Sequence, residues 1–537
     1  AKTGGGKGAS VGGSVVLSYL DNDTKAVIEN NNKEITANKV DVLAKTASKN
    51  ISTGGEIGVS TGGIAAGLTW AQNSLNNTTE AHVSGAKISG TNSELNVDAE
   101  NNAKNYAIAA AANTEVSLKN PVAIVATGAY AANTGVNHTK AIIDGSTIGN
   151  DSAKANAISV SAKDNTVLKG IAGTVTIGVG GTKVDVNAGG SVVNNKIGDS
   201  KTKQEVLAQI NNSSIKITDA KSTDAKSTET ANLNVKAKNY ANVLSVAAGG
   251  AVGFSKSPVE IGASGSVAVD NIYTLTDASM TDTDINSGST KTGNININAI
   301  SDTKVVTTAD ALSVNVDMGK VAGGTMATVA KVNSDADTTA GIYGKNKKAK
   351  ATQNVKNETV KADSKNKITN VAVGLNGTGG AGLASVGVLA NVAINKIAND
   401  TKAEVNTANI SADNLGVLAV SDEKLNNYGG ALNISISVGQ AGVALGATTV
   451  VNTILGDTTA LVNNSELAVS GAGEGIALGK EKKKGLVVNA DSAHTLNDIS
   501  VTAGGAGSAL AGVAVNATTG VNKISGATKA QVLNTDI

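Results

Sequence analysis

The chain has 537 residues, of which 62 are glycine and 9 are aromatic (7 Tyr, 1 Trp, 1 Phe), with 2 prolines and no cysteine. So few aromatic side chains argue against several compact globular domains, while 40% hydrophobic residues argue against a disordered chain. The 45 basic residues are all lysine and balance 44 acidic ones, which excludes guanidinium recognition and a basic face for nucleic acid. The composition predicts a folded but slender protein without disulfides or thiolate metal sites, as suits a large exported bacterial protein.

A short motif, T-x-A followed by alternating apolar residues, recurs along the chain. The regular copies are Thr24/Ala26, Thr79/Ala81, Thr139/Ala141, Thr276/Ala278, Thr338/Ala340, Thr401/Ala403, Thr458/Ala460 and Thr528/Ala530. A degenerate copy that contains Ala208 fills the one long interval between them, from Ala141 to Ala278. The alanines are 55 to 70 residues apart, with an average spacing of 63. Nine degenerate repeats therefore cover the chain, and we expect residues 1–537 to form one continuous elongated domain.

Three strand-like segments of about 21 residues make up each repeat. A second motif, apolar-x-apolar-x-Ala, follows each T-x-A, as in Leu95-Val97-Ala99, and departs in the sixth repeat to Glu358-Val360-Ala362. The alternation has the period of a strand, and helix is the competing prediction only for residues 106–112. The fold class expected is all-β: a single-stranded parallel β-helix, or β-solenoid, with about three coils per 63-residue repeat. About 26 coils would stack into a rod of about 120 Å.

Turns between these short strands need residues that tolerate left-handed backbone or bond their own main chain. Six residues before the repeat threonine we predict such corner positions, namely Asn73, Asn133, Asn395, Asn452 and Asn522. Isolated Asx turns are favoured there over a continuous asparagine ladder. Differences in repeat length predict loop insertions near residues 198–205, 218–231, 343–357 and 471–485, the last two with lysine runs.

Two long uncharged stretches, residues 368–395 and 428–456, exceed the length of a membrane span. Both contain polar residues and glycine pairs, so we predict strands and not membrane helices. The chain starts without an initiator Met or a signal peptide and ends inside a repeat, from which we expect a fragment of a larger chain.

Few residues in the sequence are candidates for catalysis, metal binding or ligand binding. His82, His138 and His494 share no repeat position and no metal-ligand spacing, and we expect them at exposed or turn positions. Acid pairs such as Asp21/Asp23 and Asp282/Asp284 lack the short period of calcium-binding repeats, which leaves only weak cation sites open. The start GGGKGAS does not match a phosphate loop, and lysine runs at 345–350 and 482–484 are either solubilising loops or contacts for anionic glycans and lipids. We therefore predict no enzyme activity, no cofactor and no metal site.

The segments GASGSVAVDNIYTLTDASM, GVLANVAINKIANDTKAEV and GVAVNATTGVNKISGATKAQV resemble repeats of the leukotoxin and filamentous-adhesin family of large exported bacterial proteins, which is similar in style to filamentous haemagglutinins. The resemblance spans nearly the whole chain, but it rests on the pattern of residue types within the repeats and includes no active-site motif. It implies a right-handed β-helix on the outer-membrane surface of a Gram-negative bacterium or secreted from it. It also implies export through an outer-membrane β-barrel transporter (two-partner secretion) and a receptor or membrane on leukocytes or epithelial cells as partner.

Three functions follow as hypotheses. The chain is a rod-like repeat segment of a secreted or surface-exposed virulence protein, a toxin or an adhesin, that engages host cells. Alternatively it is a stalk with no binding role of its own. The least favoured hypothesis is a polysaccharide-degrading β-helix enzyme, because such sites gather acids, a cationic or metal-bound group and aromatic platforms in one groove.

Overall fold

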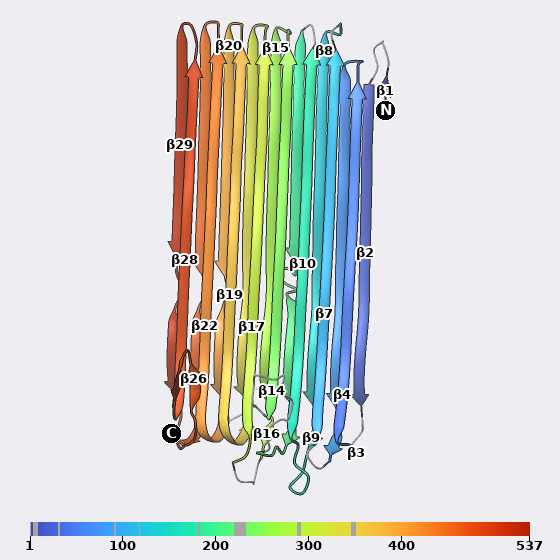
Figure 1. The fold of residues 1–537 in the computed structure, drawn as a ribbon. Coiled ribbons are helices and arrows are strands. Elements are labelled where there is room, and N and C mark those ends of the chain that lie inside the picture. The colour runs from blue at the N-terminus through green and yellow to red at the C-terminus, as the bar shows by residue number, and fades with distance from the viewer. Residues whose placement is uncertain are drawn as a thin grey trace.

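The computed structural model describes residues 2–3, 9–29, 33–90, 93–117, 119–180, 183–219, 232–286, 291–344 and 351–537. Most of these residues lie in β-strands and none is helical, so residues 106–112 are strand as predicted. Long parallel strands stack side by side in two facing sheets (Figure 1). The predicted class, an all-β parallel solenoid, is confirmed.

In the first sheet the long strands run from the loop-bearing end of the molecule to the end with tight turns. Its long members are β4 (Lys39–Ser60), β7 (Glu94–Ser117), β10 (Ala157–Gly180), β14 (Leu233–Ser255), β17 (Asn294–Asp317), β19 (Ala351–Gly380), β22 (Ala408–Ser437) and β28 (Leu486–Gly507). The short β1 (Lys2–Thr3) pairs with β4, and β25 (Glu466–Val469) pairs with β22.

The second sheet returns the chain in the opposite direction. Its members are β2 (Ala9–Glu29), β5 (Ile64–Ser84), β8 (Val122–Asp144), β11 (Val184–Ile197), β12 (Gln204–Asn211), β15 (Val259–Thr281), β18 (Val321–Tyr343), β20 (Ala384–Ala398), β21 (Thr401–Asn406), β23 (Ala441–Leu455), β24 (Thr458–Asn463), β29 (Ala511–Ile524) and β30 (Thr528–Leu533). A turn of only a few residues joins each long strand of the first sheet to the second, as between Ser60 and Ile64.

One repeat makes one coil, so the prediction of three coils per repeat is wrong. Ala44 pairs with Ala99, Ala99 with Ala162 and Ala162 with Ala237, which places each residue beside the one a whole repeat away. The predicted 26 coils and 120 Å rod fail for the same reason. A strand of 22 residues such as β4 is about 70 Å long, whereas nine stacked layers occupy about 40 Å. The molecule is a broad slab with its strands along the long dimension.

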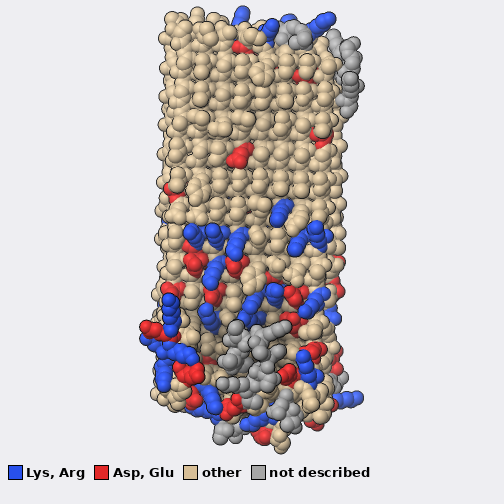
Figure 2. Space-filling model, in the orientation of Figure 1, with Lys and Arg blue, Asp and Glu red and all other residues tan. Residues whose placement is uncertain are grey.

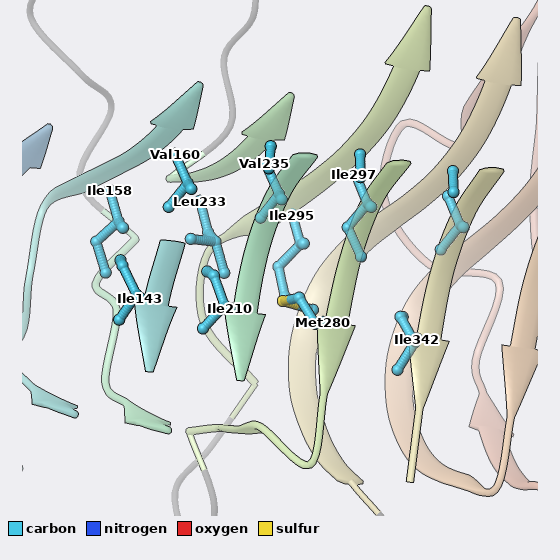
Figure 3. Close-up of a cluster of buried hydrophobic side chains, with 14 of the residues drawn as sticks. Ile143, Ile158, Val160, Ile210, Leu233, Val235, Met280, Ile295, Ile297 and Ile342 are labelled. Carbon is cyan, nitrogen blue, oxygen red and sulfur yellow. The ribbon is translucent and has the colours of Figure 1, made fainter. Parts of the chain in front are cut away.

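A third, narrow side closes each early coil at the loop-bearing end. It consists of β3 (Glu34–Thr36), β6 (Lys87–Ser89), β9 (Thr147–Ile148), β13 (Ser214–Ile215) and β16 (Asp284–Ile285), paired in that order. Between this side and the two sheets lies the main aliphatic core, where one coil places its side chains over those of the next (Figure 3). Ile143, Ile158 and Ile210 are at most 1% exposed there. The scarcity of aromatic residues follows, because stacked columns at a strand spacing of about 4.8 Å accept slender side chains best.

The loops follow the predicted insertions in part. Residues 198–203 form a turn in which the Asp199 carboxylate accepts hydrogen bonds from the backbone N–H groups of Lys201 and Thr202. Residues 471–485 carry a small antiparallel hairpin, β26 (Ile476–Leu478) and β27 (Glu481–Lys483). Most of 218–231 and the lysine run 345–350 lie outside the described residues, while 351–357 are already strand β19.

Candidate functional surfaces

The repeat threonines and alanines form two adjacent rows inside the second sheet. Strand pairing aligns Ala26, Ala81, Ala141, Ala208, Ala278, Ala340, Ala403, Ala460 and Ala530 in one row, and the threonines in the other, with Val206 in the degenerate copy. Ala81, Ala141 and Ala208 are fully buried. These positions therefore face the interior of the stack, and only those of the first and last coils, such as Ala26 and Ala530, are partly or fully exposed.

The asparagines predicted at corners lie instead within strands, so that prediction is wrong. All of them are buried except Asn522, which is exposed in the last coil. Asn73 donates to Asn133 (Nδ2 to Oδ1, 3.0 Å), and Asn133 donates to Asn195 at 2.8 Å. In the later coils Asn395, Asn452 and Asn522 continue the same pattern, with 2.8 Å between successive side chains. Because each coil is a full repeat, neighbouring coils offer partners at this position, and two ladders form in place of isolated Asx turns, separated by Val332.

Two interior acids replace or accompany these amides. Asp270 occupies the ladder position after Asn195 and accepts hydrogen bonds from Ser245 and Thr307. Asp164 accepts from Asn101 (2.6 Å) and Gln204 (3.0 Å) in the neighbouring polar row. Burial raises the pKa of each carboxyl to about 6, although the hydrogen bonds work in the opposite direction.

A second group of interior acids lies near the tight turns. Asp185 and Glu260 are paired neighbours in the second sheet and are fully buried. Burial raises the pKa of Asp185 to about 7 and that of Glu260 to about 8, and the charges of nearby acids, Asp317 for both and Glu115 for Asp185, add to the effect. No hydrogen-bond donor among the described residues reaches the Glu260 carboxyl. Glu260 is therefore a neutral acid through most of the physiological pH range.

Glu358 is the most isolated interior acid. Its neighbours in the same row of the first sheet are Ile295 and Leu415, so it stands in an aliphatic column. The side chain is 0% exposed and neither carboxyl oxygen has a hydrogen-bond partner. Burial alone raises the pKa of Glu358 to about 8.

The described residues offer no cluster of metal-ligating side chains. No three His, Asp or Glu side chains within them converge on a point where a metal ion could bind. His82 and His138 are partly exposed in strands, near Glu80 at 3.5 Å and Glu205 at 3.3 Å, and His494 contacts Ser492 at 2.8 Å. The three histidines lie in strands, so a turn position is wrong for them, and none approaches another.

Charge divides the face of the slab shown in Figure 2 into two halves. The half nearer the loops carries lysines and acidic residues close together. Lys203, for example, forms ion pairs with Asp335 (2.8 Å) and Asp337 (2.6 Å). The half nearer the tight turns is almost free of charge on the face shown. We call this second region the apolar belt and define it as the ten residues of each long strand next to the tight turns. These residues are 51–60, 108–117, 171–180, 246–255, 308–317, 371–380, 428–437 and 498–507 in the first sheet, and 9–18, 64–73, 122–131, 184–193, 259–268, 321–330, 384–393, 441–450 and 511–520 in the second.

Polarity is partly inverted within this belt. Its inward positions mix small apolar residues such as Ala109 with polar ones such as Asn113 and Glu115, all at most 1% exposed. Its outward positions are mostly apolar or small, and Ile57 and Leu68 are 78% and 51% exposed. Sequence analysis identified the alternation but missed this inversion, because alternation does not say which face is inside.

A polar hollow of about 600 Å³ lies in the charged half, between the first sheet and the 471–485 hairpin. Its lining includes Asn296 and Thr359 on the sheet and Lys482 on the hairpin. An ion pair of 3.0 Å between Lys356 and Asp219 borders it. Amides, hydroxyls and mixed charges in an open hollow can hydrogen-bond a neutral polar ligand.

No family model, no curated protein and no solved structure matches this chain. Among the described residues, no helix has the length and apolar character needed to span a membrane.

Proposed function

We propose that this chain is a rigid repeat segment of a secreted or surface-exposed bacterial virulence protein of the leukotoxin and filamentous-adhesin kind, and that it engages host cells through its outer surface. The observation that carries the proposal is the unbroken parallel pairing of coils along the whole slab. Such a stack holds loops and faces at fixed spacing, which suits a scaffold that presents a binding surface.

The polar hollow beside the hairpin is the best candidate for the contact with a host glycan or peptide. It lies on the outside, and its wall is one of the length-variable insertions where repeat proteins place binding loops. Asn296 and Thr359 project into it from neighbouring strands of the rigid sheet. The ligand would therefore meet a pre-organised surface.

Binding of the labelled full chain to leukocytes tests the proposal, with attachment and dye leakage recorded separately. We expect saturable attachment without leakage. The double variant Asn296→Ala and Thr359→Ala should bind about 30-fold more weakly, because it removes two hydrogen bonds worth about 1 kcal/mol each. Thr339→Ala, at an outward position of the second sheet, is the matched control and should bind normally.

Each of the other possible results of this experiment would support a different function. Absence of attachment would mean a stalk with no binding role of its own. Leakage would mean that the segment itself damages membranes. Attachment that is equal in the double variant and the control would remove the hollow from the proposal, and release of reducing ends from host glycans would support the enzyme hypothesis.

A further inference from the structure

The apolar belt of the second sheet contains no outward-facing charge. Its only charged residues are Asp185 and Glu260, and both point into the interior. In the first sheet the same belt has Asp310 at an outward position. The two faces are therefore unequal, and the second sheet offers the wholly uncharged one.

The uncharged face has relief. The paired rings of Trp70 and Tyr130, with centroids 4.6 Å apart, form a ridge on it. Beside the ridge a trough of about 510 Å³ crosses the strands, lined by small residues that include Ala126, Ala188 and Ala263. A ridge next to a trough of small residues is the relief that two packed sheets need to interdigitate.

The area of this face is large. Nine strands at about 4.8 Å, each contributing ten residues at about 3.3 Å, give about 1,400 Å² for one copy. Two such faces in contact would bury about 2,800 Å², more than the roughly 1,600 Å² of a standard stable interface. The largest apolar patch of a typical monomer is about 300–600 Å².

We propose that the apolar belt of the second sheet docks face to face on the same belt of a second copy of this chain, forming a symmetric pair. The contact goes beyond the proposed function, since it concerns the opposite half of the slab from the polar hollow. A two-fold pairing uses the same patch on both copies and closes, which leaves the charged halves in water.

A lipid surface is the other chemistry that fits an apolar face, and the shape of this face argues against it. The ridge of Trp70 and Tyr130 beside a trough of small residues offers complementary shapes to a second sheet, which a fluid lipid surface does not require. The strands also run straight and side by side (Figure 1), and flat many-stranded sheets are typically stabilised by stacking.

Sedimentation of the full chain over a wide range of concentration tests the pairing. We expect twice the monomer mass at high concentration, and dissociation on dilution. Val267→Lys, at an outward position of β15, the middle strand of the uncharged face, should raise the dissociation constant at least about 100-fold, because symmetry buries the new charge twice. Val252→Lys, on the belt of the first sheet, is the matched control and should leave the pairing unchanged.

A cysteine-free chain allows a second measurement that does not depend on a lysine variant. A single cysteine introduced as Ala263→Cys should react with a maleimide much more slowly in concentrated than in dilute protein, whereas Ala248→Cys on the first sheet should not. A wild-type chain that stays monomeric throughout overturns the proposal. Three other results would also overturn it. The first is an assembly that Val267→Lys leaves unchanged, and the second is equal maleimide reactivity of Ala263→Cys at all concentrations. The third is a monomer that floats with phosphatidylcholine vesicles.

Discussion

Replacing Glu358 by glutamine should remove the loss of stability that ionisation of Glu358 is expected to cause as pH rises. Glu358 is fully buried between Ile295 and Leu415 in its column, and burial raises its pKa from 4.5 to about 8. A carboxyl whose pKa is raised in the folded state contributes no penalty below the unfolded pKa. Its penalty grows as pH rises from about 5 to about 8, because folding then requires a proton or an unpaired buried charge.

The magnitude follows from the two pKa values. Between pH 5 and pH 8 the ionisation of Glu358 should cost about 3 kcal/mol of unfolding free energy. Glu358→Gln keeps the size and polarity of the side chain but cannot ionise. Relative to wild type, the variant should therefore gain about 3 kcal/mol between these two pH values.

Denaturant unfolding of both proteins at pH 5 and pH 8 measures this gain, and Glu358→Leu extends it by filling the aliphatic column with an apolar side chain. Exposed Glu481→Gln is the matched control and should show no gain. A difference between wild type and Glu358→Gln that is the same at both pH values would refute the reasoning, since Glu358 would then be solvated or paired in the folded state.

Three further predictions concern the interior. Glu260→Gln should stabilise the protein by about 4 kcal/mol more at pH 9 than at pH 5, because burial raises the pKa of Glu260 to about 8; thermal melts at the two pH values check this, and equal shifts would contradict it. Asn133→Ala should cost about 2 kcal/mol in denaturant unfolding, because its bonds to Asn195 and to the Lys169 carbonyl are lost, whereas outward Asn194→Ala should be neutral. Gly253→Ala should lower the melting temperature, since the new Cβ would lie 1.9 Å from Glu260 Oε1. Gly173→Ala, where the new Cβ has no atom within 4 Å, should leave it unchanged. Equal melting temperatures of the two variants would mean that the interior side chains move aside to make room for the new Cβ.

Sequence reasoning predicted the strands, the parallel solenoid and the residues that repeat, because alternation and spacing are local properties. It missed the size of the coil. The three apolar segments of a repeat look alike, so a turn was assumed after each, but the alternation in β14 continues unbroken from Leu233 to Ser255. Without a break in the period of two, nothing local marks where a strand ends, and only the pairing of Ala162 with Ala237 reveals the full turn.

The buried amides were missed as a consequence of the same error. Asn133 is compatible with a turn by propensity, and only a neighbour one full coil away makes it a buried ladder residue. The interior acids could not be identified from the sequence either, since Glu358 is simply a departure from the apolar-x-apolar-x-Ala motif there. Its burial depends on the columns above and below it.

The inverted polarity of the apolar belt follows from the continuity of the strands. In β7 the inward residues at the loop-bearing end are Leu95 and Val97, and the aliphatic core fixes them there. Pairing with β10 runs without a bulge from Glu94 to Ser117, so every second residue from Leu95 onward must also face inward, up to Asn113 and Glu115. A single bulge would have reversed the phase and buried the apolar side chains instead. Since none occurs in this pair, the aliphatic core at one end of each strand determines that the other end shows its apolar face to the outside, and a partner that covers this face gives the arrangement a physical reason.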